Sequence, residues 1–277
     1  MIDFFVSNIY GEKLKLNLIF KNLMKKHPEY FLKDYNISAV FGSFENSIWN
    51  GGRVNDRSLN LSFQQMKKFI NLANENELSV RYTFTNSFIN ERFLNDEISN
   101  KLMDIANNGM NGVIVNSPLL FNYLKSKYPN FHYVYSTTNC TLDAEGYNNN
   151  YDIYDILVLD WRVNKNIDFL NNLKKIDKIE ILINNTCPIA CKNVKNHYIN
   201  TDIKNLYFDK FKIPPYPCLM KKTYRQLFEK YKQHFYADFS IFLECLKAKA
   251  NPLFSREELN EYISKGFNKF KISGRSN

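Results

Sequence analysis

The stretch GVIVNSPLLFNYLKSK, at residues 112–127, contains the pattern that decides the fold of this chain. A short apolar run, Gly112–Val115, ends in the polar pair Asn116-Ser117, and an amphipathic segment, Pro118–Lys127, follows directly. We interpret the run as a buried strand and the segment as the helix that crosses over to the next strand. Polar residues at the carboxyl end of such a strand indicate a site, because βα loops converge there.

Further apolar runs end in the same way, in clusters of Asn, Asp, Arg, Ser, Thr or Cys. These runs are Ile37–Phe41, Ser79–Tyr82, Phe131–Tyr135, Ile156–Leu159 and Ile179–Ile183. Helices are predicted between or after them at Leu61–Glu75, Glu97–Asn107, Asn166–Ile176 and Arg256–Ser264, and a last strand at Lys269–Ile272. The alternation predicts parallel strands joined by right-handed crossovers, which close most simply into a (β/α) TIM-like barrel. An open doubly wound sheet is the alternative.

Length and composition favour one large α/β domain. The chain has 277 residues, of which 44% are hydrophobic, so we expect a single TIM-barrel-like domain over residues 1–277. The weaker pattern after Cys187 suggests an irregular cysteine-containing insertion after the sixth predicted strand. Met1–Phe5 lacks the features of a signal peptide, and no apolar stretch approaches the roughly 20 residues that span a bilayer. We expect a cytoplasmic protein without a membrane partner.

The formal net charge of +9 and the pI near 9.1 suit a polyanionic partner, such as RNA, a nucleotide-linked substrate or an anionic glycan. The Lys and Arg residues are scattered along the chain, however, and the chain is also rich in Asn and Ile. RNA is therefore kept as an alternative partner, because an electrostatic footprint needs a concentrated patch.

The five cysteines indicate metal binding or simple burial, because an odd number in a reducing compartment does not suit a disulfide framework. Cys187 and Cys191 come directly after the sixth predicted strand, at the expected barrel mouth. Four thiolates would suit an iron–sulfur cluster or a closed zinc site, and the candidate ligands are Cys187, Cys191, Cys218 and Cys245. Cys140 competes with Cys245 for the fourth place, and His197 could complete a zinc site with three cysteines.

Charged residues near the predicted strand ends are candidates for catalysis. Asp160 is the best general acid or base, because apolar neighbours could desolvate it, but it could instead anchor Arg162 or Lys271. The other catalytic candidates are Arg53, Arg81, Arg162 and Glu45. Arginine forks bind carboxylate or phosphate in a bidentate manner, which suits an anionic substrate, although each could also pair with an acidic residue for structure. Candidates for substrate binding are Asn86, Asn116, Asn184, Lys271 and Arg275.

Three motifs stand out late in the chain: Ile181–Pro188 with Cys191 and His197-Tyr198, then Pro252–Leu259, and then Phe270–Arg275. Together these motifs resemble the collagenase-like peptidases, peptidase family U32. The resemblance covers mainly the last third of the chain and extends loosely to Trp49–Arg53 and Arg81–Asn86.

This resemblance implies a TIM-barrel-like domain and a [4Fe–4S] cluster held by four cysteines. It also implies oxygen-independent hydroxylation, with prephenate as oxygen donor, and a homologous partner subunit. Our first hypothesis is therefore a cluster-bearing enzyme that acts on a small anionic molecule. The second is a zinc-dependent hydrolase that uses Cys187, Cys191 and His197 with Asp160 or Glu45. The third is an RNA-modifying or RNA-binding protein whose metal is structural.

Overall fold

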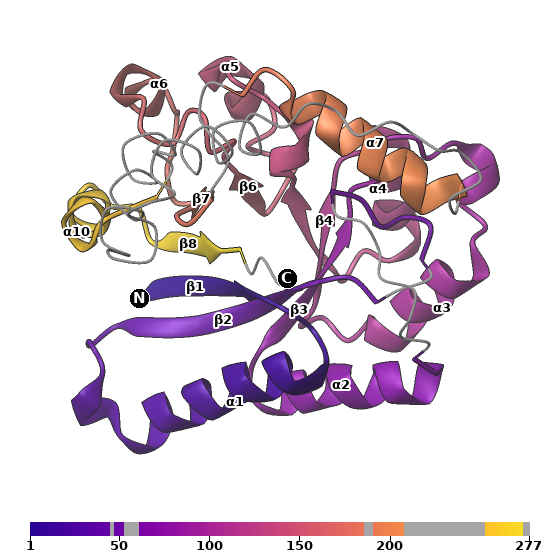
Figure 1. Cartoon of the computed structure of the whole chain (residues 1–277), viewed down its shortest axis with the longest axis horizontal. Helices are drawn as coiled ribbons and strands as arrows, with labels where there is room; N and C mark the ends of the chain where they lie inside the picture. Colours follow the sequence, from indigo (N-terminus) through magenta and orange to yellow (C-terminus); the bar gives the residue numbers. More distant parts are fainter. Residues whose placement is uncertain (45–46, 53–60, 186–190, 208–252, 274–277) are drawn as a thin grey trace, which may run out of the picture.

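The computed structural model describes residues 1–44, 47–52, 61–185, 191–207 and 253–273, and these form a closed barrel of parallel strands (Figure 1). Each strand pairs with the next along the chain, and β8 pairs with β1 to close the barrel. In the described residues the strands are β1 (Ile2–Ser7), β2 (Tyr35–Gly42), β3 (Ser79–Phe84), β4 (Gly112–Val115), β5 (His132–Tyr135), β6 (Ile156–Val158), β7 (Ile179–Leu182) and β8 (Lys269–Ile272). The predicted TIM-like barrel is confirmed, and the open-sheet alternative is wrong.

Helices follow most of the strands and cover the outside of the barrel (Figure 1). They are α1 (Gly11–Lys26), α2 (Phe63–Glu75), α3 (Glu97–Ala106), α4 (Pro118–Lys127), α5 (Ala144–Asn148), α6 (Ile167–Asn171), α7 (Val194–Tyr207) and α10 (Arg256–Ser264). Short 3-10 turns are η1 (Pro28–Tyr30), η2 (Glu91–Phe93) and η3 (Thr137–Asn139). The sequence did not predict β1, α1, α5 or α7, and α6 is shorter than the predicted helix.

Local capping fixes where the predicted helices begin. The Ser62 hydroxyl accepts a hydrogen bond from the Gln65 amide, and the Gln65 side chain accepts one from the Ser62 amide. Ser255 and Glu258 form the same reciprocal pair at the start of α10, which confirms the predicted capping box. Because each pair satisfies two backbone donors that a helix start leaves open, these boundaries follow from local sequence.

Side chains alternate between the two faces of the barrel wall, as the period of a strand requires. Val80, Tyr82 and Phe84 of β3 belong to the large cluster that packs the strands against the surrounding helices. A smaller apolar cluster fills part of the barrel interior and consists of Phe5, Ala39, Phe41, Ile114, Val134, Ile156 and Val158. In each strand that contributes to both clusters, residues that face the barrel interior alternate with residues that face the helices.

Helix α7, orange in Figure 1, crosses the mouth formed by the carboxyl ends of the strands. Its first residue, Val194, packs on Leu182 at the end of β7 and on Trp161 after β6. Farther along, Asp202 accepts hydrogen bonds from the loops that follow β2 and β3. Because β3 and β7 lie four strands apart in an eight-stranded barrel, these contacts join opposite sides of the mouth. The described helices include none with the length and apolar character of a membrane span.

Candidate functional site at the barrel mouth

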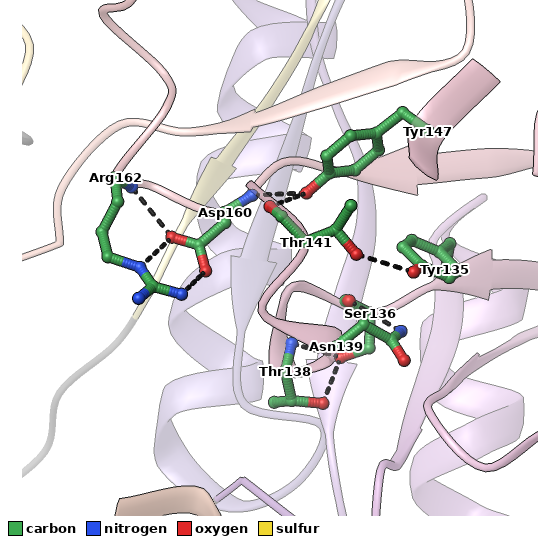
Figure 2. A network of polar contacts seen from close by, with 8 residues as sticks. All are labelled: Tyr135, Ser136, Thr138, Asn139, Thr141, Tyr147, Asp160 and Arg162. Atoms are coloured by element: carbon green, nitrogen blue, oxygen red, sulfur yellow. Dashed lines mark hydrogen bonds and ion pairs between the residues drawn. The ribbon is translucent and has the colours of Figure 1, made fainter. Parts of the chain in front are cut away.

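The best-defined polar network at the mouth surrounds Asp160, two residues after the end of β6 (Figure 2). Arg162 binds the Asp160 carboxylate with both arms of its fork, from Nε to Oδ1 at 2.8 Å and from Nη2 to Oδ2 at 2.6 Å. The Arg162 amide also donates to Oδ1, at 2.9 Å. Behind the pair, the Tyr147 hydroxyl accepts from the Asp160 amide at 2.8 Å. Asp160 is fully buried, so this bidentate pair is fixed and largely shielded from water.

In this geometry Asp160 anchors Arg162, which is the structural alternative to a catalytic role that the sequence left open. Both carboxylate oxygens already accept hydrogen bonds from Arg162, which itself stays 15% exposed at the side chain. The buried carboxylate is in direct contact with a cation, as a buried ion pair requires. A role for Asp160 as general acid or base stays a prediction.

The loop after β5 forms the second half of the network in Figure 2. The Ser136 hydroxyl accepts from the Thr138 amide at 3.1 Å, and the Asn139 side chain donates to the Ser136 carbonyl at 3.0 Å. The Tyr135 and Thr141 hydroxyls are hydrogen bonded at 2.8 Å. These local bonds hold η3 as a tight turn and bring the residue after it, Cys140, to the mouth.

Cys140 and Cys191 both contact the apolar cluster formed by Trp161, Leu182 and Val194. Cys140 adopts a left-handed backbone conformation, with φ of 56°, which costs a non-glycine residue about 1–2 kcal/mol. Burial, followed by the nearby Asp160 charge, raises the pKa of the Cys140 thiol to about 11. Cys140 is therefore a neutral thiol at pH 7. The surrounding contacts hold its backbone in a strained conformation at the mouth.

Of the four cysteines expected to bind a metal, the structure describes only Cys191, together with the competing candidate Cys140. Within the described ranges, no group of three or more His, Cys, Asp or Glu side chains is arranged to hold a metal ion. Cys187, Cys218 and Cys245 lie outside the described residues, so the structure tests neither the four-cysteine set nor the choice between Cys245 and Cys140. Cys191 lies at the mouth in an apolar surrounding, which fits one ligand of a soft-metal site.

A buried charge cluster lies inside the barrel, below the mouth. Arg81 of β3 donates from Nη1 to Glu180 Oε2 of β7 at 2.6 Å, and Lys271 of β8 lies 3.2 Å from Glu180 Oε1. The Arg81 guanidinium covers the Phe5 ring at 3.8 Å, and the Lys271 ammonium covers the Phe41 ring at 4.1 Å. Burial alone raises the pKa of Glu180, but the two cations outweigh it and lower the pKa below its usual value. Two predicted site residues thus meet around an acid that the sequence did not single out.

The three candidate asparagines have different roles. Asn86 is fully buried, and its side-chain amide donates to backbone carbonyls of Ile48, Asn50 and Asp202. Asn184 binds the backbone and hydroxyl of Ser273, which ties the end of β7 to the end of β8. Both amides are therefore occupied by structural contacts, whatever else they do. Asn116 is partly exposed and makes no side-chain hydrogen bond with the described residues, so its amide is open to a substrate.

Asp202 is a second buried carboxylate that the sequence did not single out. It is 1% exposed and accepts from the Gly52 amide at 3.2 Å and from the Ser87 amide and hydroxyl at 2.9 and 2.7 Å. Burial raises its pKa to about 6, against the lowering effect of these hydrogen bonds. The side chain thus holds α7 to the loops after β2 and β3.

The remaining candidates have separate positions. Glu45, Arg53 and Arg275 fall outside the described residues. His197 lies on α7 and is exposed, with its ring centroid 6.4 Å from that of Tyr198. A lone acidic residue within the apolar run Ile179–Ile183 was the available signal for Glu180, since strand alternation puts it on the inward face. Nothing comparable marked Asp202.

The comparisons with known proteins agree with the barrel. Residues 32–152 match the family described as Peptidase family U32. This match lies in the first half of the chain and includes Trp49–Arg53 and Arg81–Asn86, which corrects the expectation that the last third would carry the resemblance. No curated protein matches the chain.

A solved structure, "The Structure of the U32 Peptidase Mk0906", is similar to this chain with a TM-score of 0.59 and 11% sequence identity. The similarity covers 100% of this chain and 94% of that chain. At this identity the likeness shows the fold alone. By sequence the chain is therefore similar to peptidase family U32 over residues 32–152, and by fold it is similar to a U32 peptidase over its whole length.

Proposed function

We propose that this chain is an enzyme that binds a small anionic substrate at the barrel mouth and holds an iron–sulfur cluster beside it. The similarity to peptidase family U32 suggests an enzyme. The proposed reaction is an oxygen-independent hydroxylation, as the sequence resemblance implies. The proposed ligands are Cys187, Cys191, Cys218 and Cys245, and a bound [4Fe–4S] cluster would supply electron transfer at the mouth.

The observation that carries this proposal is the grouping of Cys140, Cys191, Asp160 and Arg162 at one mouth. Cys140 and Cys191 touch the same apolar cluster, and the charges of Asp160 and Arg162 act directly on the Cys140 thiol. Thiols in an apolar surrounding beside a fixed arginine suit a redox site that also admits an anion. Asp160 orients the Arg162 fork, so a substrate carboxylate would meet a guanidinium that is already held in place.

The barrel interior adds support for an anionic substrate. Arg81 and Lys271 place two cations against one carboxylate, Glu180, and the side chains of both cations are 8% exposed. Residues inside a barrel near its carboxyl end commonly reach the bound ligand. We assign Arg81 and Lys271 to positioning the acidic group of the substrate, with Asn116 as a hydrogen-bond partner at the rim.

The zinc-hydrolase alternative receives less support. It needs a general base with an available lone pair near the metal. Asp160 instead accepts three hydrogen bonds from Arg162, and His197 is exposed on α7. The cluster-bearing enzyme therefore accounts for more of the described contacts.

The test compares two cysteines in anaerobically purified protein. Wild-type protein should contain about four irons and four sulfides per chain and show broad visible absorbance that dithionite bleaches. Cys191→Ser should lose most of the iron. Cys140→Ser, the matched control at the same apolar cluster, should keep it.

Two outcomes would contradict the proposal. Full iron content in Cys191→Ser would remove Cys191 from the ligand set. About one zinc per chain in a colourless protein would favour the hydrolase instead. Circular dichroism of both variants separates loss of the cluster from loss of the fold.

A further inference from the structure

The indole of Trp161 is a buried hydrogen-bond donor at the barrel mouth. Trp161 is 2% exposed, and its Nε1 finds no acceptor among the described residues. The other tryptophan, Trp49, is fully buried as well, but its Nε1 donates to the Phe93 carbonyl at 2.7 Å. An indole N–H can only donate, and a buried tryptophan usually has a partner for it. The open N–H of Trp161 therefore indicates an acceptor that the described residues do not supply.

Other open polar groups gather at the same mouth. In the part of the chain that the structure describes, the buried side-chain atoms without a partner lie mainly on loops that follow β2, β3, β5 and β6. These loop residues are Asn50, Thr85, Thr137, Trp161 and Asn164. Buried polar groups without partners are rare in folded proteins, so their concentration here points to a ligand at the mouth.

The surroundings of Trp161 favour sulfur as the missing acceptor. Trp161 forms an apolar cluster with Leu182 and Val194, and Cys140 and Cys191 both contact that cluster. A protonated thiol accepts hydrogen bonds weakly, whereas a thiolate bound to a metal is anionic and accepts them strongly. Metal binding at Cys191, the proposed ligand in this cluster, would therefore supply the acceptor that Trp161 lacks.

We propose that the Trp161 indole N–H donates a hydrogen bond to an anionic sulfur of the iron–sulfur cluster, the Cys191 thiolate or a sulfide, and raises the reduction potential of that cluster. This inference rests on the proposed function, because it needs the iron–sulfur cluster. A hydrogen bond to sulfur stabilises the reduced state more than the oxidised one, since reduction adds a negative charge. Trp161 is thus a positioning residue, which acts on electron transfer through the sulfur that it contacts.

Redox titration of anaerobically purified, iron-loaded protein tests the inference. Trp161→Phe keeps an aromatic ring at the mouth but removes the donor, so its reduction potential should be more negative than that of the wild type. At a fixed applied potential, the ratio of reduced to oxidised protein should fall about fivefold, as expected for the loss of one hydrogen bond. Trp49→Phe is the matched control, because the Trp49 N–H is bound to the Phe93 carbonyl, and it should keep the wild-type potential. Iron content and circular dichroism establish that each variant is loaded and folded.

Isotopic labelling of the indole nitrogens gives a second measurement, which needs no Trp161 variant to fold. Electron–nuclear double resonance of the reduced, labelled wild type should show magnetic coupling between the iron–sulfur cluster and an indole nitrogen. Loaded Trp161→Phe with the wild-type potential, or loaded wild type without this coupling, would overturn the inference and leave the proposed function intact. Wild-type protein that contains no iron would overturn both.

Discussion

Replacing Glu180 with Gln should destabilise the barrel more than any exposed charge change of the same kind. Glu180 is fully buried, and its oxygens lie 2.6 Å from Arg81 Nη1 and 3.2 Å from Lys271 Nζ. Glu180→Gln keeps the shape but leaves two buried cations without their anion. Breaking a buried pair in this way typically costs about 3–5 kcal/mol. For a chain of this size that loss lowers the melting temperature by about 10 °C.

The matched control is Glu261→Gln. Glu261 pairs with Lys265 at the same 2.6 Å, but the side chains are 57% and 44% exposed, so its loss should cost less than about 1 kcal/mol. Urea denaturation of both variants measures the difference. If Glu180→Gln stayed within about 1 kcal/mol of the wild type, the reasoning about buried charge inside this barrel would be refuted.

Acidification should remove the same stabilisation in the wild type. Burial alone would raise the pKa of Glu180, but Lys271 and Arg81 lower it below the ordinary value. The pair therefore contributes its full stability above about pH 4.3, the unfolded pKa, and loses it as the pH falls through the lower folded pKa. The difference in free energy of unfolding between the wild type and Glu180→Gln should be constant near neutral pH and should become smaller in strong acid. If this difference in unfolding free energy did not change with pH, charge would not be its cause.

Two further variants test the loops around the mouth. Burial raises the pKa of Asp202 to about 6, so its contribution to stability is full below the unfolded pKa near 4 and lost as the pH rises through 6, a change of about 3 kcal/mol at most. Asp202→Asn should abolish this dependence between pH 4 and 7 in denaturation curves, and an unchanged slope would contradict the assignment. Gly51→Ala would place a Cβ 2.4 Å from the Asn86 backbone nitrogen, so it should lower the free energy of unfolding by several kcal/mol. Gly42→Ala is the control in the same assay. Its Cβ would lie 3.5 Å from an Ile9 side-chain carbon, so it should cost about 1 kcal/mol or less.

The sequence predicts most of the barrel because its strands follow local rules. The apolar runs from Ile37–Phe41 to Ile179–Ile183 correspond to β2 through β7, and the predicted last strand corresponds to β8. The Ser255 capping box forms as expected, because both of its hydrogen bonds are local. The Asp160–Arg162 pair, two residues apart, was likewise accessible as an alternative. Features whose partners are close in sequence were therefore predictable.

The buried charge cluster was not predictable as a unit, because its members come from distant strands. Arg81 and Glu180 are separated by 99 positions, and their contact depends on how the barrel closes. Strand alternation could have placed Glu180 inside, but an apolar run with one acid is also typical of an edge strand. Asn86 and Asn184 were identified by position, while the structure uses their amides to tie loops together. Position at a strand end indicates the mouth, and it does not separate a substrate contact from a structural one.

Two long helices, α1 and α7, were not predicted because neither has a single apolar face opposite a polar one, and they differ from that pattern in opposite ways. In α1 the exposed Leu16, Ile19, Phe20 and Leu23 add a second apolar face, which removes the contrast that periodicity detects. In α7 the buried positions include polar residues, such as Asp202 and Asn205, which bond the loop backbones at Gly52 and Asn50. A helix whose apolar pattern fails is therefore informative, because its extra apolar or polar positions indicate a contact beyond the barrel core. For α7 that contact is with the loops of the mouth.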